Sequence, residues 1–397
     1  MQKFAISTPE GTRDILFAEC ALRRRIEAGI TKLFMRRGYT EVVTPSVEYY
    51  DVFLATGAPM NECGMLKLID RTGSILVLRP DATTPIARVA ATRLALEPPP
   101  YRLYYVQNVF RSDISHNGKN SEIYQAGVEL IGASGRTADV EVLTLAVQAL
   151  EASGVADYRI EIGHAGFFRA LVSSLPLDEA GKEEIRLLVE EKNFAALNDF
   201  LRPYEAYPAS AALKLLPQLF GGEEVFDEAL ALTDTEEAAA AIHYVRAIYD
   251  ELSAADLADK VMVDFGLVHQ MSYYTGIVFR GYAEGAGGTV LSGGRYDSLA
   301  ASFGRELPAT GFAIDIDAIC QCSEVFESLK PTVCVYYAGG FLKKALHFID
   351  NQPAGMCEMS ACDTYEEAMR QARNKGFTTL AVIDSEGTRL VPVERGL

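Results

Sequence analysis

The N-terminal part of the chain changes from a helical to an extended hydrophobic pattern. Residues 19–37 carry apolar side chains at the spacing of one helix face, and Gly38 follows as a stop signal. The apolar positions are Leu22, Ile26, Ile30, Leu33 and Phe34. Residues 40–48 (TEVVTPSVE) are β-branched but include Pro45, which cannot donate to a neighbouring strand. The pattern predicts a helix, then a strand at a sheet edge or an interface.

The next segments alternate between strand and helix patterns. Turn residues 71–73 separate two short apolar runs and predict a hairpin of residues 66–70 and 74–81. Two longer strands, predicted at 101–112 and 121–132, are joined by the polar segment ISHNGKN. Helices are predicted at 84–96, before a triple proline, and at 139–153.

The second half of the chain begins with a change of character. Residues 166–255 are rich in alanine, leucine and glutamate and show no strand signal, which predicts an all-helical insertion. Strand patterns return at 261–266, 272–282 and 289–297, and a helix is predicted at about 310–322. After Pro331 the pattern is strand, helix, strand, helix and two further strands.

This order of elements predicts an α+β protein in which helices flank a mostly antiparallel sheet. The expected domains are residues 1–325, with the insertion at about 166–255, and a small α/β unit at 326–397. The chain has neither a G-x-G-x-x-G after a strand nor a G-x-x-x-x-G-K-[ST] motif, so a phosphate-binding loop is unsupported.

The net charge of the chain is strongly negative, which makes nucleic acid an unfavourable partner. The chain has 54 acidic and 37 basic residues, a formal net charge of −17. Nucleic-acid binders usually present a basic surface, because neutralising phosphates supplies much of their affinity. We therefore expect small molecules and proteins as partners, with no nucleic acid.

Composition also limits the location and the metal chemistry. No apolar run reaches the roughly 18 residues of a membrane span, and residues 1–14 lack the apolar core of a signal peptide. We expect a cytoplasmic protein that binds no membrane. The seven cysteines are irregularly spaced, without C-x-x-C pairs, which favours free thiols over a zinc site. No metal and no cofactor are expected.

Two segments carry polar side chains in positions suited to a binding site. Asp81 lies between a predicted strand and a predicted helix, where a helix cap is the simplest interpretation. Gln125, Gly127 and Glu129 alternate along a predicted strand, so they share one face of the sheet. That face could line a cavity or simply meet solvent.

Four segments together resemble the class II aminoacyl-tRNA synthetases. They are RRGYTEVVTPSVE (36–48), LRPDATTPIARV (78–89), VFRSDISHNGKNSEIYQAGVELIG (109–132), and YYTGIVF with SGGRYDSLAASFG and PATGFAIDIDAI (within 273–319). The YYTG and GGRYD segments make the chain similar to histidyl-tRNA synthetase over about residues 5–320. The resemblance implies a six-stranded antiparallel sheet flanked by helices, dimerised through the first segment.

The resemblance also implies a histidine-binding pocket. Asp81 and Thr83 match the segment that holds the α-ammonium group, and Arg111 matches the arginine that grips the carboxylate. Gln125 and Glu129 match the residues that line the amino-acid pocket, and three tyrosines match those that enclose the imidazole ring. These tyrosines are Tyr273, Tyr274 and Tyr296.

The same comparison shows losses where synthetases hold ATP. His269 and Ala318 stand at positions of two arginines, Ser272 replaces an aspartate, and Lys119 and Ser121 replace two loop arginines. Adenylate formation depends on cations that stabilise charge on the reacting phosphate. The sequence therefore predicts that the amino-acid pocket is kept and that the activation reaction is lost.

A synthetase-like chain without activation chemistry is similar to the regulatory subunits of short-form ATP phosphoribosyltransferase. That resemblance implies a homodimer within a hetero-oligomer, a short catalytic subunit as partner, and histidine as feedback effector. Residues 326–397 would be a shortened remnant of the anticodon-binding domain. Two alternatives remain open: a divergent, active histidyl-tRNA synthetase, and a synthetase-like sensor of another amino acid or of uncharged tRNA.

Overall fold

The structure is a computed structural model of the chain and describes residues 6–55, 64–112, 120–268, 274–323 and 331–394. The chain forms two compact units, and the smaller one contains the described residues from 331 onward. Each unit has its own sheet and its own hydrophobic core.

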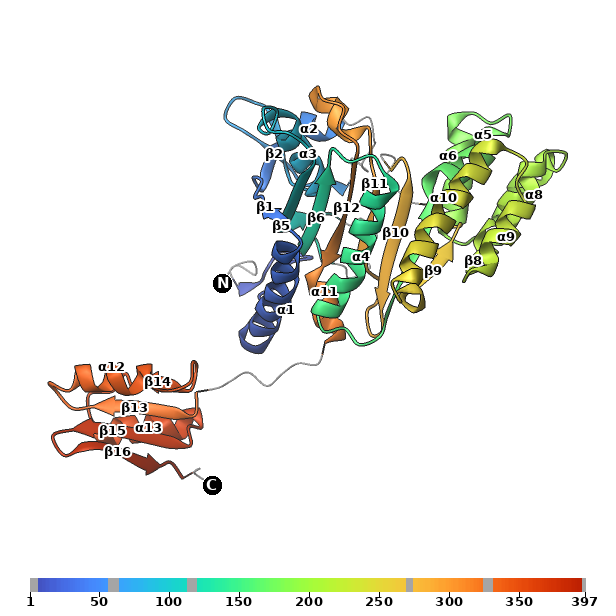
Figure 1. The fold of residues 1–397 in the computed structure, drawn as a ribbon. Helices are drawn as coiled ribbons and strands as arrows, with labels where there is room; N and C mark the ends of the chain where they lie inside the picture. Colours follow the sequence, from blue (N-terminus) through green and yellow to red (C-terminus); the bar gives the residue numbers. More distant parts are fainter. Residues whose placement is uncertain (1–5, 56–63, 113–119, 269–273, 324–330, 395–397) are drawn as a thin grey trace. The chain divides into compact units, whose positions relative to one another are not determined.

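The larger unit is built on a nine-stranded sheet with the order β1-β5-β6-β12-β11-β10-β7-β9-β8 (Figure 1). Its strands are β1 (Thr40–Glu41), β5 (Tyr101–Phe110), β6 (Glu122–Ile131), β7 (Tyr158–His164), β8 (Phe220–Gly221), β9 (Val261–Asp264), β10 (Ile277–Ala283), β11 (Thr289–Arg295) and β12 (Ala309–Asp315).

The centre of this sheet confirms the six-stranded antiparallel arrangement that the resemblance implies. Neighbours from β5 through β6, β12, β11 and β10 to β7 all pair antiparallel. The sheet is larger than expected because β1 adds to β5 in parallel at one edge, while β9, parallel to β7, and β8 extend the other. The α+β class is as predicted.

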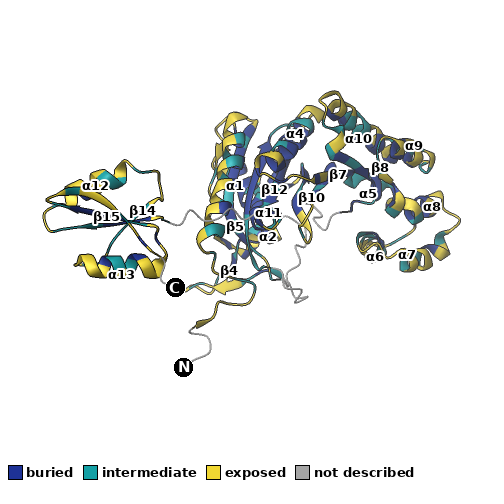
Figure 2. Ribbon diagram, turned by 90° about the horizontal axis from the view of Figure 1, so that it is seen from below, coloured by how far each residue is buried: buried dark blue, intermediate teal, exposed yellow. Residues whose placement is uncertain are grey.

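Two groups of helices cover the two faces of the sheet. On one face α1 (Phe17–Arg36), α4 (Arg136–Ala152) and α11 (Ile316–Cys322) pack on Ala126, Val128 and neighbouring residues (Figure 1). On the other face α3 (Thr83–Thr92) and a short 3₁₀ helix (Leu299–Phe303) pack on Tyr105, Val109 and Val278. The strands between the layers are largely buried (Figure 2).

The first helix follows its sequence pattern closely. Leu22, Ile26, Ile30 and Phe34 are the buried residues of α1, and they lie on one face because they recur every four residues. The chain then turns at Gly38, whose φ of 80° is a left-handed conformation that glycine adopts without steric cost. The predicted helix and its stop are confirmed.

Helices dominate the chain between β7 and β9, and we call this group the helical block. It consists of α5 (Ala165–Ser173), α6 (Glu179–Glu190), α7 (Phe194–Leu201), α8 (Pro208–Leu215), α9 (Glu224–Ala231) and α10 (Glu236–Ala254). The expectation that it holds no strand is wrong in one detail. The two-residue strand β8 pairs with β9, because its backbone meets the open sheet edge there.

Two other local expectations need correction. Residues 309–315 form β12 instead of the first half of a helix, since pairing with both β6 and β11 outweighs local preference. Residues 40–48 are divided at Pro45, because β1 joins the main sheet while β2 joins a separate one. That sheet has the order β2-β4-β3 and contains β2 (Val47–Tyr49), β3 (Lys67–Ile69) and β4 (Ile75–Leu78), with α2 (Tyr50–Leu54) following β2.

The smaller unit is a four-stranded sheet with the order β14-β13-β15-β16 and one helix on each face. Its elements are β13 (Val333–Tyr337), α12 (Leu342–Asp350), β14 (Cys357–Met359), α13 (Tyr365–Lys375), β15 (Thr379–Asp384) and β16 (Gly387–Pro392), in the predicted order. Within the described ranges no disulfide links the cysteines, and every helix is too short or too polar to span a membrane.

Candidate functional site

A pocket lies on the α3 side of the main sheet, over the strands β5, β6, β11 and β12. The space left free between its lining side chains is small, about 30 Å³, which is room for roughly two water molecules. The residues that line it are Asp81, Ala82, Thr83, Tyr105, Arg111, Gln125, Glu129, Tyr274, Ser292, Tyr296, Gly311, Phe312 and Ala313.

The structure brings seven of the eight predicted site residues to this one pocket: Asp81, Thr83, Arg111, Gln125, Glu129, Tyr274 and Tyr296. The eighth, Tyr273, lies outside the described residues. Of the two interpretations of the polar face of β6, a cavity wall or a solvated surface, the cavity wall is correct. Gln125 and Glu129 line the pocket and are buried.

Glu129 is the more enclosed of the two carboxyl groups in the pocket, with only 1% of its surface exposed. Its Oε1 accepts a hydrogen bond from the Thr83 hydroxyl at 2.7 Å, and its Oε2 accepts one from the hydroxyl of Tyr296. Burial raises the pKa of Glu129 to about 8, although both hydrogen bonds oppose the shift. The free pocket therefore holds a carboxyl group that is largely protonated at neutral pH.

Asp81 has two roles at the start of α3. Its Oδ1 accepts a hydrogen bond from the Thr84 backbone N–H at 2.7 Å, and its Oδ2 accepts one from the Thr84 hydroxyl at 3.1 Å. The helix-cap interpretation is therefore correct, and the same carboxylate also lines the pocket. Burial raises the pKa of Asp81, while the Thr84 bonds and the positive charge of Arg111 oppose this shift.

Among the described residues that line this pocket, Arg111 is the only cation. It follows β5 directly and is held at the rim, where its Nε donates to the carbonyl oxygen of Pro80 at 2.8 Å. Its backbone N–H donates to the carbonyl oxygen of Ser121 at 2.8 Å, which closes the end of the β5–β6 hairpin. A guanidinium group in this place can pair with a ligand carboxylate.

Glycines make room for the large side chains of the pocket. A Cβ at position 127 would lie 2.6 Å from the Tyr105 hydroxyl, and one at position 294 would lie 2.7 Å from the Tyr274 ring. A Cβ at position 311 would lie even closer to the Glu129 carboxyl group. Any other residue at these three positions would displace a wall of the pocket.

Tyr105 and Gly311 also line the pocket, and neither was predicted as a site residue from the sequence. Register could have located both, because Tyr105 lies opposite Gly127 and Gly311 lies opposite Glu129 in the sheet. Cross-strand neighbours share a face, so the partners of a known site residue are candidates themselves.

Beside the pocket, the junction of β12 and α11 is acidic. Asp315 caps α11 by accepting the Ala318 N–H at 2.9 Å. Asp317 accepts the Tyr124 N–H at 3.0 Å and lies 3.5 Å from the Arg23 guanidinium group. Burial raises the pKa of Asp315 to about 6, an effect that the charge of Asp317 reinforces.

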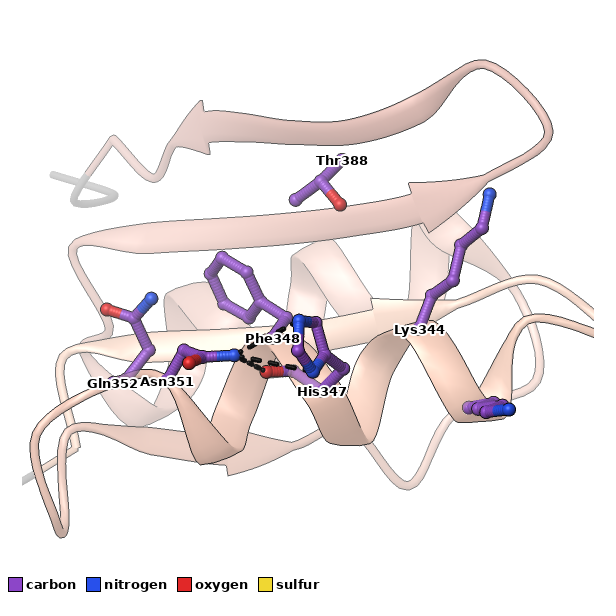
Figure 3. Close-up of a pocket in the computed structure, with 7 residues that line it drawn as sticks. Lys344, His347, Phe348, Asn351, Gln352 and Thr388 are labelled. Atoms are coloured by element: carbon purple, nitrogen blue, oxygen red, sulfur yellow. Dashed lines mark hydrogen bonds between the residues drawn. The ribbon is translucent and has the colours of Figure 1, made fainter.

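A second hollow lies on the smaller unit, between α12 and β16 (Figure 3). Its lining is Lys343, Lys344, His347, Phe348, Asn351, Gln352 and Thr388. Asn351 closes one side by donating to the His347 carbonyl oxygen at 2.7 Å. This lining carries cations and no carboxylate, so it cannot complement both charges of an amino acid.

Across the described ranges, no cluster of three or more His, Cys, Asp or Glu side chains could hold a metal ion.

The chain is similar over most of its length to proteins of known families. The family model described as histidyl-tRNA synthetase matches residues 11–319. The ATP phosphoribosyltransferase regulatory subunit of Clostridium kluyveri is 41% identical over 94% of this chain and 98% of its own length. The protein of the same name from Bacillus cereus is 34% identical over 98% of this chain and 94% of its own length.

Solved structures give the same result. A protein from Bacillus halodurans C, described as an ATP phosphoribosyltransferase regulatory subunit/histidyl-tRNA synthetase, is 30% identical with a TM-score of 0.85, covering 97% of this chain and all of that one. A histidyl-tRNA synthetase from Nostoc sp. PCC 7120, 18% identical with a TM-score of 0.76 over 96% of this chain and 92% of its own, shows the fold alone. The chain therefore belongs to the family of ATP phosphoribosyltransferase regulatory subunits, which has the class II fold of histidyl-tRNA synthetase.

Proposed function

We propose that the chain is a non-catalytic subunit that senses histidine and makes a short ATP phosphoribosyltransferase catalytic subunit active. The observation that carries the proposal is the pocket itself, which combines two buried carboxyl groups with one guanidinium group at the rim. Relatives that match almost the whole chain carry the regulatory-subunit name. The reaction of the complex would be the first step of histidine biosynthesis, with histidine as its feedback signal.

The pocket suits the functional groups of histidine. Asp81 would pair with the α-ammonium group and Arg111 with the α-carboxylate, both as charge-assisted hydrogen bonds. Glu129 and Tyr296 would meet the imidazole, whose two nitrogens need one donor and one acceptor. Tyr274, packed against Gly294, would provide an aromatic wall for the ring.

The surroundings of the pocket support a role without adenylate formation. A site for that reaction gathers cations around phosphate oxygens. Here Ala318 carries no charge, and the carboxylates of Asp315 and Asp317 stand beside it. Ser121 lies at the hairpin end, where its N–H donates to the Gly11 carbonyl oxygen. The other altered positions, Lys119, His269 and Ser272, lie outside the described residues.

Mixing the purified chain with a short-form catalytic subunit tests the proposal. We expect formation of phosphoribosyl-ATP at a rate that neither protein gives alone. An unchanged rate would contradict the regulatory role. One observation favours the alternative, an active histidyl-tRNA synthetase. The related protein from Bacillus halodurans C is described both as a regulatory subunit and as a histidyl-tRNA synthetase. Histidine-dependent exchange of pyrophosphate into ATP by this chain alone would establish that alternative.

A homodimer is part of the proposal, and the three-stranded sheet supports it. One face of this sheet packs on Tyr50, Phe53 and Met65 through Val77. The other face carries three apolar side chains in a row across the strands, with Leu76 in the middle and Tyr49 and Leu68 on either side. This row meets solvent, and Tyr49 is 58% exposed. An apolar face of this kind indicates an interaction surface, and we propose a second copy of the chain as its occupant.

Leu68→Asp is expected to raise the dissociation constant of this dimer by roughly 10- to 100-fold. Burying one leucine contributes about 1.5–3 kcal/mol, and a buried unpaired carboxylate adds a penalty. Sedimentation velocity over a concentration series measures the effect. Leu187→Asp on α6 is the matched control, since the leucine there is similarly exposed, at 40% against 46%. Equal dissociation of both variants would rule out this interface.

A further inference from the structure

A buried ion pair lies next to the pocket and joins β11 to α4. The Nε of Arg295 donates to Oδ2 of Asp139 at 3.0 Å, and its Nη2 lies 2.9 Å from Oδ1. Asp139 is fully buried and Arg295 is 5% exposed. The same guanidinium group donates to the carbonyl oxygen of Ala133 and to Asp297, each at 3.0 Å. Its position is therefore fixed from several directions.

The helical block reaches into this ion pair through one side chain. The Tyr244 hydroxyl, from α10, donates to Oδ2 of Asp139 at 2.6 Å, so Tyr244 and Arg295 share one carboxylate oxygen. Burial, helped by the Asp139 charge, raises the pKa of Tyr244 and keeps the hydroxyl protonated. The neighbouring ring of His164 lies edge-on at 5.7 Å, and burial lowers the pKa of this histidine to about 4. Because the imidazole of His164 is therefore neutral at pH 7, Arg295 is the cation that pairs with Asp139.

The backbone of Arg295 continues the connection into the pocket. Its carbonyl oxygen accepts a hydrogen bond from the Thr275 N–H at 2.7 Å, and Thr275 directly follows Tyr274. The next residue in the chain, directly after the end of β11, is Tyr296, whose hydroxyl donates to Glu129. Tyr274 and Tyr296, two of the three tyrosines that line the pocket, are thus attached to the residue that Tyr244 and Asp139 hold.

The helical block contacts the Tyr274 segment from a second side. Nη2 of Arg169, on α5, donates to the Thr275 carbonyl oxygen at 2.9 Å. The backbone N–H of Ala165, where α5 begins, donates to the carbonyl oxygen of Gly276 at 2.9 Å. The segment that carries Tyr274 is therefore held between the helical block and β11.

We propose that Tyr244 is a positioning residue through which the helical block controls the affinity of the amino-acid pocket. The inference rests on the proposed function, since it concerns the same histidine site. Tyr244 does not line the pocket. It acts through Asp139 and Arg295, which hold Tyr274 and Tyr296 ready for the ligand. Anything that shifts α10 would then change histidine affinity, and histidine would in turn stabilise the position of α10.

Tyr244→Phe is expected to weaken histidine binding by roughly two- to twentyfold. Without the hydroxyl, Asp139 loses one of its donors and Arg295 gains freedom to move. Part of the binding free energy must then go into ordering Tyr274 and Tyr296, so the measured affinity falls. Tyr249→Phe is the matched control, because Tyr249 lies on the same helix and packs its ring on Phe226 at 5.6 Å within the helical block.

Isothermal titration with histidine measures the affinities, and hydrogen exchange of α10 supplies a second reading that a purely structural role would not change. We expect histidine to slow amide exchange in α10 of the wild-type protein and of Tyr249→Phe, and to do so much less in Tyr244→Phe. Equal histidine affinity and equal protection in Tyr244→Phe and wild type would overturn the inference and leave the proposed function intact. If the wild-type protein bound no histidine at all, the proposed function and this inference would both be wrong.

Discussion

Asp81→Asn is expected to weaken histidine binding by roughly 30- to 700-fold while leaving the fold intact. The asparagine amide oxygen can still accept the Thr84 N–H, so the start of α3 keeps its cap. The charge that would pair with the ligand ammonium is lost, however. Removing one partner of a buried charge pair costs about 2–4 kcal/mol, which corresponds to that range of affinity.

Titration calorimetry of Asp81→Asn and a matched variant measures this effect. Asp178 caps α6 by accepting the Gly181 N–H at 2.9 Å, outside the pocket. Asp178→Asn therefore makes the same chemical change at the same kind of position and should bind histidine like the wild type. Wild-type affinity in Asp81→Asn, or equal losses in both variants, would show that the carboxylate of Asp81 does not bind the ligand.

Glu129→Gln is expected to remove a large pH dependence of stability. The pKa of Glu129 is about 8 in the folded chain, compared with an ordinary value of 4.5. Between these values the unfolded chain releases the proton and the folded chain keeps it. The free energy of unfolding contributed by this group therefore falls by about 1.4 kcal/mol per pH unit as the pH rises, until the folded group also ionises near pH 8.

Urea unfolding at pH 5, 7 and 8 tests this expectation. Glutamine cannot ionise, so Glu129→Gln should gain stability relative to the wild type as the pH rises, with the smallest difference at pH 5. Glu228→Gln, at an exposed position on α9, should follow the wild-type curve. Parallel curves for the wild type and Glu129→Gln would mean that the buried carboxyl group does not titrate as we describe.

The hydrophobic pattern was sufficient where an element is decided by its own residues. The four-residue recurrence of Leu22, Ile26, Ile30 and Phe34 is enough to specify α1, because a helix hydrogen-bonds within itself. The alternation of Gln125 and Glu129 also placed both side chains on the same face correctly, since the side-chain period of a strand is two.

Long-range pairing decided what the pattern left open. Residues 309–315 contain the apolar run GFAI, which suits a helix or a strand, and only pairing with β6 and β11 makes it β12. Tyr104 and Tyr105 are adjacent and both buried, yet one packs in the core against the α1 layer and the other lines the pocket. The register of β5 on β6 makes that choice, and it depends on the whole hairpin.

The link between Tyr244 and Asp139 is another feature that the sequence did not reveal. The two residues are 105 positions apart, on helices of the helical block and of the main sheet layer. No local pattern pairs a tyrosine with a particular carboxylate at that separation. The same holds for Arg295, which the sequence places on a predicted strand without revealing the buried ion pair that it makes with α4.

The most direct test of a histidine-sensing subunit is the histidine response of the complex formed with a short-form catalytic subunit. We predict that histidine inhibits phosphoribosyl-ATP formation by the wild-type complex. A complex containing Asp81→Asn should be equally active without histidine and should need more histidine for half inhibition, by the factor that calorimetry gives for binding. Identical inhibition curves for the two complexes would show that histidine acts elsewhere and would contradict the account.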